Sequence, residues 1–126
     1  MSEQNKAAAR IAFEVWSRGD LNRLDEVIAS EVVHHDPYDP HGAEGLAAMK
    51  ESITRMRGMY PDLQMTVEDQ VAEGDKVATR WTATMTHDGT QVTLRGITLD
   101  RFENHKIVEA WRCMDMLGFL QQTRAR

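Results

Sequence analysis

The hydrophobic periodicity of the chain changes at Pro61, and this change constrains the fold more than any other sequence feature. Before Pro61, apolar residues recur mainly at every third or fourth position, which is typical of amphipathic helices. After Pro61, apolar and polar residues alternate, which is typical of half-buried strands. Helices followed by a series of strands predict an α+β fold with an antiparallel sheet. The 126 residues are the length of one domain, so we expect a single domain over residues 1–126.

Three helices are expected before Pro61. The apolar stripe of the first includes Trp16, and Gly19 provides a C-terminal stop. Asp20 then resembles the N-cap of a short second helix. The third helix spans roughly residues 43–59, where apolar side chains lie three or four positions apart, and Pro61 ends it.

The predicted strands are separated by short turns. The first, over residues 31–35, contains β-branched residues and precedes a loop over residues 36–42 that holds two prolines and a glycine. Asp88-Gly89 suits a type I′ hairpin turn. We expect the other strands over residues 63–67, 77–87, 91–102 and 107–115, and a last helical turn over residues 116–120. One face of this sheet must be buried against the helices.

The composition excludes several classes of protein. A formal charge of -5 argues against binding to nucleic acid or to an anionic membrane surface. Cys113 is the single cysteine, which excludes an internal disulfide and a cysteine-based zinc cluster and fits a reducing compartment. No apolar run approaches the roughly 20 residues that span a bilayer, and the N-terminus lacks the apolar core of a secretory signal. We therefore expect a cytoplasmic protein that binds neither nucleic acid nor membranes.

Short sequence strings follow one another in a defined order along nearly the whole chain. They are Trp16 with Gly19-Asp20, Val32-Val33-His34-His35-Asp36-Pro37, Tyr60-Pro61-Asp62-Leu63, the segment 71–78, Arg80-Trp81-Thr82, Arg95-Gly96-Ile97, Arg101-Phe102, and the segment 107–111 with Asp115. Together these strings resemble the SnoaL-like polyketide cyclase family, within the nuclear-transport-factor-2-like (NTF2-like) superfamily. The superfamily has a cone-shaped α+β fold, in which a curved antiparallel sheet wraps over three N-terminal helices and leaves a cavity inside.

The resemblance also implies a chemistry. Cyclases of this family close a ring by an intramolecular aldol reaction and use no cofactor and no metal. An aspartate near the end of the last strand acts as general acid and base, and Asp115 matches that position. His35 matches a frequent pocket histidine on the first strand. The expected partner is therefore a small apolar molecule that bears a carbonyl group, and no cofactor or metal is expected.

Two positions depart from the family pattern. The loop between the two central strands is often long, but here it is only residues 87–91. A histidine often precedes the tryptophan of the last strand, where this chain has Ala110. The superfamily also commonly dimerises through the outer face of its sheet, so we expect a homodimer. If Asp115 faces inward, the residues of the last strand on that outer face are Val108, Ala110, Arg112 and Met114.

Asp115 is the first candidate catalytic residue. An uninterrupted period of two would place it on one face of the last strand with Trp111 and Cys113. A carboxyl group there would be partly desolvated, which raises its pKa and suits it to move a proton next to a carbonyl. The alternative is that Asp115 caps the helical turn predicted over residues 116–120.

His35 is the second candidate. His34 and His35 are adjacent on a strand, so only one of them can face the interior, and the resemblance favours His35. It could donate a hydrogen bond to an enolate oxygen or shuttle a proton; the alternative is a histidine bonded to backbone or water. With Asp36, Asp39 and His41 these histidines are suitable metal-ligand types, but adjacent strand histidines diverge, so we expect a polar loop over the cavity mouth.

Aromatic and sulfur-containing side chains are the candidates for contacting a flat apolar ligand. For each of them ordinary core packing is the alternative, and for His87 a solvated hairpin tip. The expected substrate-binding residues are Trp16, Ile53, Met56, Trp81, Met85, His87 and Trp111.

Three functions follow from these residues. The first is a cofactor-independent cyclase or isomerase, in which Asp115 transfers a proton next to a carbonyl. The second is a protein that binds a small molecule without chemistry. A third is epoxide-hydrolase-like activation of water, for which Asp100, Arg80 and Asp115 would have to converge.

Overall fold

The computed structural model describes residues 2–37 and 45–124. The helical elements are α1 (Ser2–Arg18), the single 3₁₀ turn η1 (Leu21–Arg23), α2 (Leu24–Val27), α3 (Leu46–Met59) and α4 (Met116–Arg124). The strands are β1 (Ile28–His35), β2 (Gln64–Glu73), β3 (Lys76–His87), β4 (Thr90–Glu103) and β5 (Lys106–Met114). None of the described helices is long and apolar enough to cross a bilayer.

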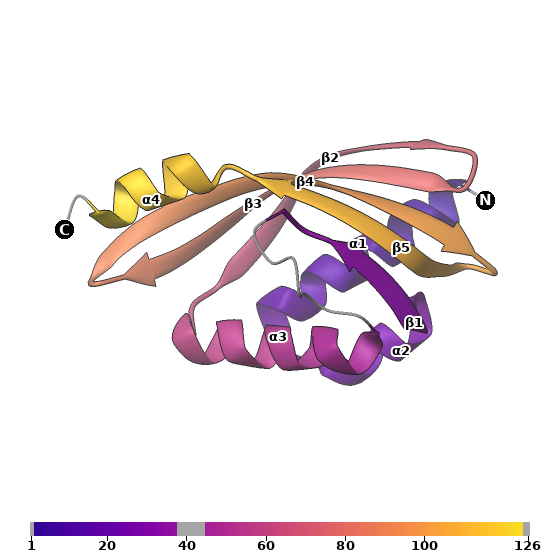
Figure 1. Ribbon diagram of the computed structural model, residues 1–126, viewed down its shortest axis with the longest axis horizontal. Helices are drawn as coiled ribbons and strands as arrows, with labels where there is room; N and C mark the ends of the chain where they lie inside the picture. Colours follow the sequence, from indigo (N-terminus) through magenta and orange to yellow (C-terminus); the bar gives the residue numbers. More distant parts are fainter. Residues whose placement is uncertain (1, 38–44, 125–126) are drawn as a thin grey trace.

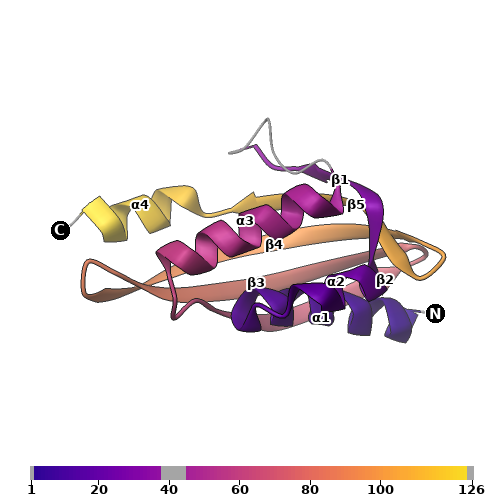
Figure 2. The same ribbon diagram turned by 90° about the horizontal axis from the view of Figure 1, so that it is seen from below.

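The strands form one curved sheet in the order β1-β5-β4-β3-β2. β1 runs parallel to β5, and the other neighbours are antiparallel. Both views place α1 and α3 on the same face of this sheet, whereas α4 extends beyond β5 toward the β3–β4 hairpin (Figures 1 and 2). The predicted α+β architecture is therefore confirmed. The side of the sheet that faces α1 and α3 is its inner face, and the opposite side is its outer face.

Local signals account for most of the element boundaries. α1 ends where Gly19 adopts φ +82°, a left-handed conformation that costs glycine little. The β3–β4 turn has positive φ at both Asp88 and Gly89, as a type I′ turn requires. Asp20 precedes η1, but its side chain makes no capping hydrogen bond and instead pairs with Arg23 at 3.6 Å.

Four predicted segments differ by three residues or more at one end. β2 continues to Glu73, beyond the strand predicted over residues 63–67. β1 begins at Ile28, three residues before the predicted strand, and the last helical turn continues as α4 to Arg124. The third helix begins at Leu46 instead of residue 43. Of the predicted loop over residues 36–42, only residues 36 and 37 lie within the described part of the chain.

A bulge in β5 changes which of its side chains face inward. Arg101 of β4 pairs with Glu109, but the next residue, Phe102, pairs with Ile107. Val108 is therefore the extra residue of a β-bulge, and the alternation of faces shifts by one position after it.

The bulge makes the predicted faces of the last strand wrong. We expected Trp111 and Cys113 to face inward and Ala110, Arg112 and Met114 to face outward. Instead Ala110 is buried, and Arg112 and Met114 line the interior. A period of two holds only within an unbroken ladder, and the bulge breaks the β5 ladder near its start.

Candidate active site

A cavity of about 360 Å³ lies between the inner face of the sheet and the helices α1, α3 and α4. Its walls are mostly apolar, and six of the eight methionines of the chain contribute to them. Methionine side chains are flexible and polarizable, so such a wall adapts to ligands of different outline. The methionines concerned are Met56, Met59, Met65, Met85, Met114 and Met116.

A second cavity of about 50 Å³ lies against the same wall. Four residues line both cavities: Trp16, Met65, Trp81 and Arg112. The small cavity has a different chemistry, because His34, Thr98 and Asp100 also line it. We call these three residues the inner polar cluster.

The sheet places His34 and Asp100 on either side of Ala110. Ala110 of β5 pairs with His34 of β1 and with Asp100 of β4. Neighbouring strands are about 4.8 Å apart, so the two backbones are separated by roughly 10 Å. Ala110 fills little of the space between the two side chains, because its side chain is a single methyl group. This is the position at which the family often has a histidine.

Asp100 is a buried carboxyl group that no hydrogen bond from the described residues stabilises. Its exposed fraction is 5%, and none of the described residues donates a hydrogen bond to its carboxyl oxygens. Burial disfavours the charged form and raises the pKa of Asp100 to about 7. Near neutral pH the group is therefore divided between a proton donor and a proton acceptor, which suits general acid–base chemistry.

His34 shows the opposite shift. Burial lowers its pKa to about 4, and the positive charge of Arg112 lowers it further, against a smaller opposing effect of Asp36. The ring is therefore neutral at pH 7. Its Nδ1 atom is buried and has no hydrogen-bond partner among the described residues.

Arg112 is the cationic side chain of the site. Its Nη2 and Nε donate to Oδ2 of Asp36 at 2.6 and 3.2 Å, and the Asp36 side chain is only 6% exposed. Both residues line the larger cavity, and Arg112 also lines the smaller one. The ion pair therefore brings a guanidinium into the site without adding net charge.

Trp81 forms part of the wall shared by the two cavities. Its Nε1 donates to Oγ1 of Thr98 at 2.9 Å. The indole ring lies over Gly96 on the neighbouring strand, where any Cβ would collide with it. Glycine at this position thus allows a large ring to lie flat against the sheet.

The comparisons with known proteins agree with this architecture. The sequence model of SnoaL-like polyketide cyclases matches residues 6–123, nearly the whole chain. The chain belongs to the SnoaL-like polyketide cyclase family. A search of curated protein sequences found no match.

Solved structures resemble this SnoaL-like protein over almost its full length. A candidate polyketide cyclase from Acidithiobacillus ferrooxidans is 30% identical, with a TM-score of 0.86 and coverage of 97% of this chain and 95% of that one. IdmH, a candidate polyketide cyclase from Streptomyces antibioticus, is 27% identical, with a TM-score of 0.85 and coverage of 94% and 97%. AclR, a candidate hydroxylase from Streptomyces galilaeus, is 26% identical, with a TM-score of 0.83 and coverage of 100% and 99%.

Asp115 lies outside both cavities of this SnoaL-like protein. It is exposed, and its Oδ1 accepts a hydrogen bond from the backbone N–H of Gly118 at 2.9 Å. This bond is an N-cap of α4. The prediction of a partly desolvated inward-facing carboxyl was wrong, and the alternative, a helix cap, is what the structure contains.

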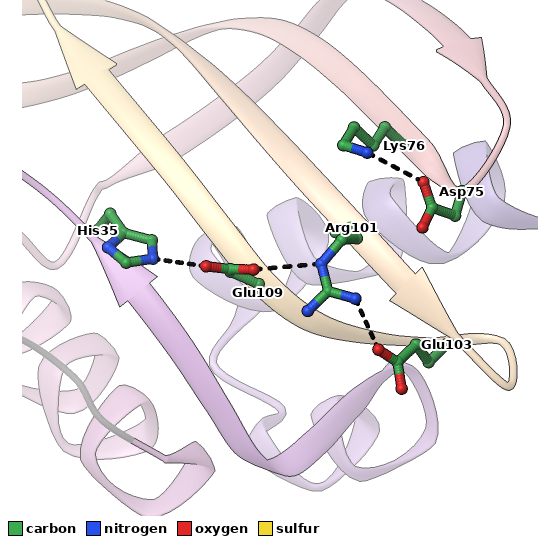
Figure 3. A network of polar contacts seen from close by, with 6 residues as sticks. All are labelled: His35, Asp75, Lys76, Arg101, Glu103 and Glu109. Carbon is green, nitrogen blue, oxygen red and sulfur yellow. Dashed lines mark hydrogen bonds and ion pairs between the residues drawn. The ribbon is translucent and has the colours of Figure 1, made fainter.

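His35 faces outward, so the predicted orientation of the two histidines was also wrong. Its Nε2 lies 2.8 Å from Oε2 of Glu109, and its ring stacks on Trp111 with centroids 5.3 Å apart. Figure 3 shows that Glu109 also accepts from Arg101, which in turn donates to Glu103. This outer network crosses β1, β5 and β4 on the outer face of the sheet.

The predicted binding residues divide into those at the cavity and those elsewhere. Trp16, Met56, Trp81 and Met85 line the larger cavity, and their contact with a substrate stays a prediction. Three others do not line it: Ile53 is fully buried in the core, Trp111 lies on the outer face, and His87 bonds the hydroxyl of Tyr60 at 3.3 Å. Tyr60 itself lines the cavity.

Two other predicted clusters do not assemble. Arg80 and Asp115 are both exposed while Asp100 is buried, so the three residues expected to activate water do not converge. Of the histidine-rich segment, His34 and His35 diverge, and Asp39 and His41 lie outside the described residues.

Sequence reasoning named Asp100 only for the activation of water and chose His35 over His34, although one signal pointed to Asp100 as the buried carboxyl. On β4 the residues Val92, Leu94, Gly96, Thr98, Asp100 and Phe102 alternate with more exposed ones. Asp100 is the one ionisable side chain in this inward-facing series. A carboxylate in an otherwise buried strand face is an indication of function.

Proposed function

We propose that this SnoaL-like protein is a cofactor-independent cyclase or isomerase in which Asp100 transfers a proton at the carbon next to a carbonyl group. The observation that carries the proposal is a buried carboxyl, with a pKa of about 7, in the small cavity that shares a wall with the larger apolar one. Family membership and the similarity to candidate polyketide cyclases support a cyclase-type function. The substrate class is a small apolar molecule that bears a carbonyl.

The proposed first step is proton abstraction. The carboxylate of Asp100 removes a proton from the substrate carbon, and the electron pair of that C–H bond moves into an enolate. Arg112 is the cation on the wall of both cavities, so its guanidinium stabilises the charge that develops on the enolate oxygen. The substrate body lies among the methionines and Trp81.

The proposed second step returns the proton. In a ring closure, the enolate carbon attacks a second carbonyl of the same molecule, a carbon–carbon bond forms, and protonated Asp100 gives its proton to the new alkoxide. In an isomerisation, Asp100 returns the proton to a different carbon and the double bond moves. A carboxyl with a pKa near 7 serves both directions, because neither of its protonation states is strongly favoured.

The test is solvent deuterium uptake by bicyclic and tricyclic aryl ketones, starting with 1-tetralone. We expect the protein to catalyse exchange at the carbon next to the carbonyl, and Asp100→Asn to slow it by about 100-fold or more. Asp115→Asn is the matched control, since it changes a carboxyl outside the cavities and asparagine still caps helices. Full activity of Asp100→Asn would overturn the mechanism. Ketones that bind but return without deuterium would favour the non-catalytic binding function instead.

A further inference from the structure

Two polar groups that line the small cavity have no hydrogen-bond partner among the described residues. Nδ1 of His34 is buried and unpaired among the described residues. The carboxyl of Asp100 receives no hydrogen bond from the same set of residues. Both side chains line the cavity of about 50 Å³. Unpaired buried polar groups cost free energy, so folded proteins usually satisfy them with protein groups or ordered water.

The cavity is large enough to hold a water molecule. One water occupies about 30 Å³ in the liquid and needs two to four polar partners when buried. A third partner is available in Thr98, whose oxygen accepts the Trp81 N–H and whose own hydrogen is left to donate. A water here donates its two hydrogens to His34 and Asp100 and accepts from Thr98.

The strand register separates the two groups by a gap that a bridging molecule can span. Because His34 and Asp100 pair with opposite sides of Ala110, their backbones are roughly 10 Å apart, and no direct hydrogen bond joins their side chains. The methyl group of Ala110 leaves the space between them open. A larger side chain at position 110 would fill it.

We propose that the small cavity binds one water molecule that bridges Nδ1 of His34 and the carboxyl of Asp100, and that His34 acts on Asp100 through this water as a positioning residue. The neutral ring of His34 carries its proton on Nε2, which leaves Nδ1 free to accept. When Asp100 is ionised, the water donates to it and stabilises its charge. When Asp100 is protonated, its O–H donates to the water.

Among residues 2–37 and 45–124, few charged groups act on this pair. Arg112 and Asp36 act on His34 from β5 and from the residue after β1, and His35 acts on it from the next position. For Asp100, burial is the cause of its shift. Loss of the bridging water therefore removes a donor to the ionised carboxyl, and the pKa of Asp100 rises further.

Three variants distinguish the effect of the water on Asp100 from the effect of the His34 ring. His34→Asn places an amide near the position of Nδ1, whereas His34→Phe replaces the imidazole with a phenyl ring that has no nitrogen. Ala110→Val leaves both polar groups and fills the space between them. Circular dichroism and thermal unfolding identify any variant that fails to fold. Because substitutions at two positions, 34 and 110, should each remove the water, the test does not depend on one variant being folded.

The readouts are a high-resolution crystal structure of the full chain and the pKa of Asp100 by carbon-detected NMR. We expect density for a water within hydrogen-bond distance of both groups. We also expect the pKa to rise by about one unit or more in His34→Phe and Ala110→Val, and to stay near the wild-type value in His34→Asn. Absence of the water, or equal pKa values in His34→Asn and His34→Phe, would overturn the proposal.

The catalytic part of this inference rests on the proposed function, but the two fail separately. If Asp100→Asn keeps full activity while the water and the pKa response are present, the reaction mechanism is wrong and the water site stands. If the water is absent while Asp100→Asn is inactive, the mechanism stands and His34 has no positioning role.

Discussion

The inner and outer faces of the sheet carry the same kinds of side chain in opposite environments. His34 and His35 are adjacent in the chain, yet His34 is held neutral by burial while His35 bonds Glu109 on the surface. The two carboxylates differ in the same way. Burial raises the pKa of Asp100, whereas the hydrogen bond from His35, with help from Arg101, lowers that of Glu109. The face of the strand therefore decides whether burial or a hydrogen bond sets the pKa of a carboxyl group.

The largest expected effect is on the pH dependence of stability. In the wild type, Asp100 and His34 change the free energy of unfolding in opposite directions as pH rises from about 4 to 6.5. The raised pKa of Asp100 means that its contribution is lost as pH rises toward 7, because the folded state holds the proton longer. The lowered pKa of His34 means that its contribution is lost as pH falls below 6.5, because the unfolded state binds the proton first. The two slopes cancel, so we expect a nearly flat profile.

Single variants expose the two slopes. In Asp100→Asn the free energy of unfolding should rise by roughly 3 kcal/mol between pH 4 and 6.5. In His34→Phe it should instead fall by a similar amount, roughly 3 to 4 kcal/mol, between pH 4 and 7. Urea unfolding across this range measures both. Slopes of the same sign in the two variants would contradict the assignment.

The packing of the inner face predicts a smaller effect at Gly96. An alanine there would collide with the Trp81 ring and place its Cβ 2.9 Å from the carbonyl oxygen of Cys113. We expect Gly96→Ala to lower the free energy of unfolding by about 1–3 kcal/mol and to weaken ligand binding, because Trp81 is pushed into the cavity wall. Gly58→Ala is the matched control: it lies in α3, has no atom within 4 Å of the added Cβ and should be neutral or stabilising.

The cap at the end of β5 predicts an effect on stability alone. Asp115→Ala removes the acceptor for the Gly118 N–H and should cost about 1 kcal/mol. Asp115→Asn retains a capping side chain and should cost less. Thermal unfolding measures the difference, and neither variant should change the rate of deuterium exchange. A loss of exchange in both, with stability unchanged, would return Asp115 to the catalytic site.

The smallest effect is expected from the outer network. Glu109→Gln removes the charge that joins His35 and Arg101, but exposed ion pairs contribute little and are screened by salt. Because the pKa of Glu109 is lowered, its contribution is present above the pKa of the unfolded chain and is lost as pH falls below it. Unfolding of the wild type and of Glu109→Gln should differ slightly at low salt, and the difference should disappear at high salt.

A sedimentation measurement on the same variant tests the predicted homodimer, which the resemblance assigns to this outer face.

The sequence predicted the elements well because their signals are local. Gly19 and Asp88-Gly89 mark a helix end and a hairpin by their own backbone preferences. The site was predicted less well because it depends on which face each side chain takes. The bulge at Val108 reverses the alternation of β5, and an irregular register between Ile28 and Val33 affects β1. A bulge is set by pairing with the neighbouring strand, so a single strand's sequence does not reveal it.

The inward-facing position of Asp100 could be predicted from the sequence, whereas the environment that shifts its pKa could not. Its position in the inward-facing series of β4 follows from simple alternation. Its lack of a partner depends on Ala110 and His34, which come from two other strands. Its raised pKa is caused by burial, which depends on the elements that cover it and not on its own strand alone.

The pKa of the Asp100 carboxyl is the measurement that tests the account most directly. Carbon-detected NMR of the full chain, with Asp100→Asn to assign the resonance, yields the titration midpoint. We predict a midpoint near 7, with Asp100 as the acid–base group of the cavity. A midpoint at or below the model-peptide value of about 3.9 would mean that the carboxyl is ionised and compensated in the folded protein, and it would contradict the proposed mechanism.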